Sequence, residues 1–99
     1  MSHGDSYAME LACFRKGFGA NVRRLRRASD RAYSQEALAE RARLHRTEIG
    51  KIEQGSVEPR LSTLVVLADA LGVTLDEMVA GLGVPKQRRP PPSLRARAH

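Results

Sequence analysis

Residues 46–54 carry side chains whose types and spacing suit hydrogen bonding to the exposed edges of paired bases. If this segment is helical, Ile49 and Ile52 mark the side that is buried in a core. The opposite side then presents two long cations, two neutral polar groups and a glycine, which are Arg46, Lys51, Thr47, Gln54 and Gly50. Arginine and lysine can donate to O6 and N7 of guanine, and threonine can contact the thymine methyl group. The pattern predicts contact with DNA bases in the major groove, and a surface helix that is merely basic is the simpler alternative.

Other arrangements that carry chemistry are not assembled in the sequence. We find no Ser/His/Asp set, no paired carboxylates and no glycine-rich phosphate loop, so we do not expect an enzyme. The single cysteine, Cys13, excludes an intramolecular disulfide and a zinc site built on cysteine pairs. None of the histidines has a partner at metal-ligand spacing, and these are His3, His45 and His99. We therefore expect neither a metal nor a cofactor, and the low cysteine content fits a reducing, cytoplasmic setting.

The charge of the chain is positive and unevenly distributed. Its 99 residues include 17 lysines and arginines against 11 acidic residues, which gives a net charge of +6. Residues 84–99 hold five bases and no acid, and residues 15–31 hold seven bases and one acid. Residues 61–83 hold three acids and no base. A basic patch and a basic tail favour a polyanionic partner, with nucleic acid first, although each basic run alone is also typical of a solvated surface.

The sequence does not predict association with a membrane. The N-terminal segment has no basic region followed by an apolar stretch, as a secretory signal would. The longest apolar run, at 64–68, has five residues, whereas a membrane-spanning helix needs about 20. We therefore expect no membrane partner and a cytoplasmic location.

Five helices and no strand are predicted around the polar face of residues 46–54. The first helix begins at Leu11, and its apolar residues recur every three or four positions until the pattern breaks at 29–32. Ser34 can cap the second helix, and Gly55 ends the third. Between Ser34 and Gly55, two short helices are joined by a tight turn near 42–44. This arrangement is typical of a helix-turn-helix, whose second helix enters the major groove of DNA.

Two further helices and three regions complete the prediction. The fourth helix carries apolar residues from Leu61 to Leu71, and a Thr-x-x-Glu capping box begins a fifth that ends near Ala80. The first ten residues form either a flexible arm or a short extension of the first helix. The regions are then an N-terminal arm, a helix-turn-helix domain and a disordered, proline-rich basic tail, at residues 1–10, 11–83 and 84–99.

Residues 14–82 resemble the lambda-repressor-like family of DNA-binding domains, which includes Cro, phage repressors and XRE-type regulators. The resemblance rests on short matches in a fixed order, which are 22–26, 34–39, Ile49, 52–55, Pro59, Leu64 and 70–73. The run at 44–50 is similar to the subset that includes restriction–modification controller proteins. The resemblance implies an all-α, five-helix fold and a transcription regulator that binds double-stranded DNA as a homodimer.

The resemblance also implies roles for individual residues. Base contacts would come from Arg46, Thr47 and Lys51. Backbone contacts would come from Gln35, Gln54, Ser56 and Arg60, and we add a turn, capping or phosphate role for His45. Arg26 and Glu53 would form an ion pair between the first helix and the recognition helix. The chain departs from the family pattern at three places, which are two extra residues within 29–32, Arg43 at a turn position usually held by glycine, and Arg60 at a usual capping position.

The last helix is the predicted dimer interface because it lies at the acidic end of the domain and is rich in apolar residues. These are Leu75, Met78, Val79 and Leu82. Met78 and Val79 alternatively belong to the core alone. Two other functions remain open: an antitoxin or restriction–modification controller-type regulator, and a protein-interaction adaptor of the same fold. The basic tail is expected to strengthen binding to any duplex without choosing sequence.

Overall fold

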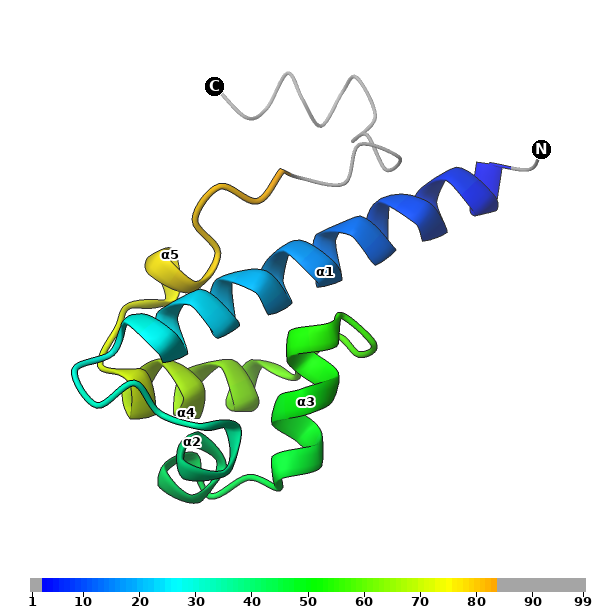
Figure 1. Cartoon of the computed structure of the whole chain (residues 1–99). Coiled ribbons are helices and arrows are strands. Elements are labelled where there is room, and N and C mark those ends of the chain that lie inside the picture. Colours follow the sequence, from blue (N-terminus) through cyan, green and yellow to red (C-terminus); the bar gives the residue numbers. More distant parts are fainter. Residues whose placement is uncertain (1–2, 84–99) are drawn as a thin grey trace.

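The computed structural model describes residues 3–83, with side chains from residue 8 onward, and this range contains five helices and no strand. In Figure 1, α1 is a long rod, and the other helices gather along its C-terminal half. The helices are α1 (His3–Ala28), α2 (Gln35–Ala42), α3 (Arg46–Gln54), α4 (Leu61–Leu71) and α5 (Leu75–Met78). The predicted all-α architecture is confirmed, and the predicted tail at 84–99 lies outside the described residues.

Helix α1 is longer than its apolar pattern predicts. It begins at His3 rather than at Leu11, so residues 3–10 extend the first helix, which is the second of the two alternatives that the sequence left open for them. Alanine, methionine and glutamate in this stretch favour helix, but Ala8 and Met9 are exposed and have no core to face. Apolar residues recur at helical spacing only where a helix packs against other elements. The sequence pattern therefore does not indicate that α1 begins at His3.

Every helix contributes to one apolar core. The largest fully buried side chains include one from each helix, namely Val22, Leu38, Ile49, Leu67 and Met78. Helix α1 packs mainly against α3, and a Cβ atom built on Gly19 would collide with the main-chain carbonyls of Ile52 and Glu53. Glycine is therefore required at position 19, where α1 crosses the C-terminal end of α3. This close approach fixes the position of α3 against α1.

The turn between α2 and α3 contains a strained residue. Arg43 has φ 58° and ψ 41°, the left-handed conformation that glycine adopts without cost. Its N–H donates to the carbonyls of Ala39 and Glu40, and the N–H of Leu44 donates to Ala39 at 2.8 Å. These hydrogen bonds close the end of α2 and turn the chain sharply into α3.

Replacing Arg43 by glycine is expected to stabilise the protein. The left-handed conformation costs a non-glycine residue about 1 kcal/mol, which glycine avoids, so the melting temperature should rise by about 4 °C. Thermal unfolding followed by circular dichroism measures this change. Arg43→Ala is the matched control, because it removes the side chain and keeps the strain. A glycine variant no more stable than the alanine variant would show that the turn carries no strain.

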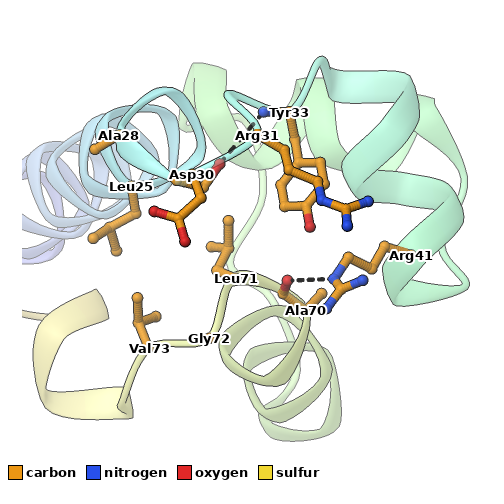
Figure 2. Close-up of a pocket in the computed structure, with 11 residues that line it drawn as sticks. Leu25, Ala28, Asp30, Arg31, Tyr33, Arg41, Ala70, Leu71, Gly72 and Val73 are labelled. Carbon is orange, nitrogen blue, oxygen red and sulfur yellow. Dashed lines mark hydrogen bonds between the residues drawn. The ribbon is translucent and has the colours of Figure 1, made fainter.

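Helix α2 is held against α4 at the pocket drawn in Figure 2, which lies between the end of α1, the loop that follows it and the end of α4. Nε of Arg41 donates to the carbonyl oxygen of Ala70 at 2.8 Å. The guanidinium also lies over the ring of Tyr33, 5.6 Å from its centre. A cation is favourable beside the last carbonyls of a helix. These contacts hold α2 against the end of α4 and against the loop that follows α1.

Candidate nucleic-acid interface

The outer side of α3 and the first turn of α2 line one shallow cleft. Its lining residues are Gln35, Arg46, Thr47, Gly50, Lys51 and Gln54. Arg46, Thr47 and Lys51 are exposed, whereas Ile49 and Ile52, on the opposite side of α3, are 0% and 2% exposed. The folded chain thus brings the three candidate base-contacting side chains into one row beside Gln35.

The candidate backbone contacts lie around the cleft. His45 and Ser56 are exposed residues just before and just after α3, and Gln54 is exposed in its last turn. Arg60 is exposed at the N-cap of α4. The carboxylate of Glu48 accepts from the main-chain N–H of His45 at 3.3 Å, so this acid closes the first turn of α3.

Gln35 is anchored inside the protein in a way that the sequence did not reveal. Its side-chain Nε2 donates to Oε1 of Glu53 at 3.0 Å, and the side chain is half-buried. Nε2 has a second hydrogen, and the main-chain N–H of Gln35 lies in the first turn of α2, so both remain available to an anion. A Cβ atom on Gly50 would lie 3.9 Å from Oε1 of Gln35, which is an ordinary contact. Internal packing therefore does not require glycine here.

A buried carboxylate, Glu53, joins α1, α2 and α3. Arg26 donates from Nε to Oε2 at 2.6 Å and from Nη2 to Oε1 at 2.9 Å. Arg23 adds a longer contact from Nε to Oε1 at 3.3 Å. The Glu53 side chain is 0% exposed and that of Arg26 10%. Arg26 also donates from Nη1 to the carbonyl of Tyr33 at 2.9 Å, which ties the loop before α2 to the same cluster.

Opposing effects set the pKa of Glu53. Burial raises it, but hydrogen bonds from Arg26, Gln35 and Arg23 lower it, and the net result is a pKa below the ordinary value. The hydrogen bond with Glu53 raises the pKa of Arg26, against the effect of burial. Glu53 is therefore a charged partner that fixes α3 against α1. Arg23 was missed from the sequence, although its spacing of three residues from Arg26 places both on one side of α1.

Part of the predicted dimer interface needs correction. Met78 is 0% exposed and lies in the core, so it cannot contact a partner. Leu82 is half-buried and packs against the core, whereas Leu75 and Val79 are 41% and 40% exposed. Helix α5 ends at Met78, short of the predicted end near Ala80. An apolar sequence alone does not separate a side chain that faces the core from one that faces solvent in so short a helix.

Residues 22–78 match the sequence profile of the family described as "Helix-turn-helix". The chain belongs to the helix-turn-helix family. It is 38% identical over 68 residues to "Control protein C.SmaI" of Serratia marcescens, which covers 69% of this chain and 79% of that protein. It is also 36% identical over 64 residues to the "SPbeta prophage-derived uncharacterized HTH-type transcriptional regulator YonR" of Bacillus subtilis (strain 168), covering 65% of this chain and 57% of that protein.

Membership of the helix-turn-helix family confirms the predicted resemblance to XRE-type regulators. The chain is a DNA-binding transcription regulator, and the comparisons point to this class rather than to an enzyme. Across residues 3–83, no helix is long and apolar enough to span a bilayer. The described part of the chain also has no cluster of three or more His, Cys, Asp or Glu side chains that could hold a metal ion.

Proposed function

We propose that the chain binds a near-palindromic DNA site as a homodimer, with the outer side of each α3 in a major groove. The observation that carries this proposal is the row of exposed Arg46, Thr47 and Lys51 on α3, opposite its buried isoleucines. In this arrangement the two cations donate to guanine, and the threonine methyl meets thymine.

The flanking residues position the protein without reading sequence. The proposed phosphate contacts lie at both ends of α3 and at the starts of α2 and α4. Their main-chain or side-chain donors belong to Gln35, His45, Gln54, Ser56 and Arg60. Phosphate contacts fix register and orientation on the duplex. The basic segment 84–99 adds sequence-independent affinity. Because its ligand is DNA, we assign the protein to the cytoplasm.

Exposed apolar side chains support the dimer. Apart from Met9, the large exposed hydrophobic residues of the described part all belong to α4 or α5 and its C-cap, and they are Leu61, Val65, Val66, Leu75 and Val79. Leu75 and Val79 are the two that belong to α5 and its C-cap, at 41% and 40% exposure, and we infer that they pair with a second copy of the chain, because exposed apolar surface can mark an interaction site. In Figure 1, α5 lies across α1 from α2 and α3, so pairing through Leu75 and Val79 leaves the candidate DNA-binding face free. Two-fold pairing would place the two recognition helices about 34–36 Å apart, one turn of DNA.

A control function within a small gene module is the second candidate. It is favoured by the similarity to a protein named a control protein, of which the chain covers 79%. A regulator of this kind would bind upstream of its own gene. Footprinting on the native upstream region distinguishes the two candidates, because a general regulator need not protect that region.

Alanine variants separate base readers from positioning residues. Arg46→Ala and Lys51→Ala should each weaken binding to the preferred duplex by about 1–3 kcal/mol and relax the preference at particular base pairs. Gln35→Ala should weaken the preferred and a scrambled duplex about equally, because phosphate contacts carry no sequence information. Fluorescence anisotropy titrations at one fixed salt concentration measure these affinities.

Arg27→Ala is the control for loss of a positive charge, because Arg27 is exposed on α1 and outside the proposed base-reading row. It should leave the ratio between the two affinities unchanged. If Arg46→Ala weakened the scrambled duplex as much as the preferred one, the outer side of α3 would not be the reading surface.

A further inference from the structure

An acidic residue, Glu36, lies beside the first arginine of the recognition helix. Nε of Arg46 is 3.3 Å from Oε1 of Glu36, and this ion pair joins the first turn of α2 to the first turn of α3. The two side chains are 66% and 72% exposed, so both are accessible to DNA. Glu36 follows Gln35 directly, which places a carboxylate between a proposed phosphate contact and a proposed base contact.

The guanidinium of Arg46 can serve Glu36 and a base at the same time. An arginine side chain has five N–H donors in a flat fork. Glu36 takes the Nε edge, and the terminal nitrogens Nη1 and Nη2 can donate to O6 and N7 of a guanine. A phosphate, by contrast, lies on the DNA backbone rather than in the groove. A phosphate would therefore compete with the Glu36 carboxylate for the guanidinium of Arg46, because both groups are anionic acceptors.

We propose that Glu36 is a specificity-determining residue that acts through Arg46, and this rests on the proposed DNA-binding role of α3. On a preferred site, a guanine and Glu36 share Arg46. On other duplexes, Arg46 gains a phosphate contact only by leaving Glu36, whose unpaired carboxylate then repels the DNA backbone. Glu36 thereby lowers the affinity for unpreferred DNA more than the affinity for preferred DNA, which is discrimination by a repulsive element.

The test compares Glu36→Gln with the matched control Glu40→Gln. Both variants remove one exposed carboxylate from α2, and the part of the chain that the structure describes gives Glu40 no ion pair. Affinities are measured for a duplex selected from a random pool and for a scrambled duplex of equal length and composition. Glu36→Gln should lower the ratio of the two affinities by a factor of about 3 to 5, the scale of an exposed ion pair. Glu40→Gln should change both affinities together and leave the ratio unaltered.

A double variant shows whether Glu36 acts through Arg46. With Arg46→Ala already present, Glu36→Gln should no longer change the ratio, because the carboxylate has no arginine to hold. An unchanged ratio in Glu36→Gln alone, or an equal change in the Arg46→Ala background, would overturn this role for Glu36. A wild-type protein that does not distinguish the two duplexes would instead overturn the proposed function, and this role with it.

Discussion

Arg26→Met is expected to lower the free energy of unfolding by about 3 kcal/mol, because it leaves the buried carboxylate of Glu53 without its main partner. The two hydrogen bonds at 2.6 and 2.9 Å are lost, and only Gln35 and the longer contact to Arg23 remain. The melting temperature should fall by roughly 15 °C. Chemical unfolding followed by circular dichroism measures the change in free energy.

Two further variants make this result interpretable. Arg27→Met removes a neighbouring exposed arginine and should change stability by no more than about 0.5 kcal/mol. Adding Glu53→Met to Arg26→Met should recover much of the loss, because a buried ion pair can be replaced by apolar side chains at little cost. A single Arg26→Met variant as stable as Arg27→Met would mean that the ion pair does not hold α3 in place.

The destabilisation should depend on pH. Because the pKa of Glu53 is lowered in the folded protein, its ionised form stabilises the fold at neutral pH. This contribution is complete above the pKa of the unfolded chain and is lost as the pH falls through the lower, folded-state pKa. The difference in stability between the wild type and Arg26→Met should therefore be largest near neutral pH and shrink in acid. A difference that grew in acid would contradict the assigned charge on Glu53.

Val79→Asp should convert the protein to monomers and weaken operator binding on the order of 100-fold, because a dimer gains its second half-site at high effective concentration. Val79 is 40% exposed, so the charge is not forced into the core, and the melting curve of the monomer should remain cooperative. Sedimentation velocity measures the oligomeric state, and anisotropy measures binding to the selected duplex.

Met9→Asp is the control, because it places the same charge at an exposed apolar residue on α1, outside the α4 and α5 side chains that support the dimer. It should leave both the dimer and the affinity for DNA nearly unchanged. A wild-type protein that sediments as a monomer at micromolar concentration, with and without DNA, would remove the proposed interface and favour the adaptor function.

The sequence predicted the helix-turn-helix well because its signals are local. Caps at Ser34 and Gly55 and the apolar spacing of α3 are set within a few residues, so they can be read without knowing the fold. The extra residues at 29–32 come after Arg26 in the chain, within the loop that leads to α2. Arg26 lies in α1, before these residues, and it reaches Glu53 of α3 whatever the length of that loop.

What the sequence could not predict depends on contacts between distant segments. The hydrogen bond from Gln35 to Glu53 and the ion pair between Glu36 and Arg46 each join two helices through side-chain geometry. The burial of Met78 depends on how α5 meets α1, where Asn21 donates to the carbonyl of Met78 at 3.0 Å. Local patterns contain no information on such contacts.

Selection of bound DNA from a random pool, run in parallel for the wild type and Arg46→Ala, tests most directly whether the outer side of α3 reads sequence. The wild type should enrich two inverted half-sites with centres about 10 base pairs apart. Arg46→Ala should lose the preference at one position in each half-site and keep it elsewhere. Identical preferred sequences from the two proteins, or no enriched sequence from the wild type, would contradict a reading role for the outer side of α3.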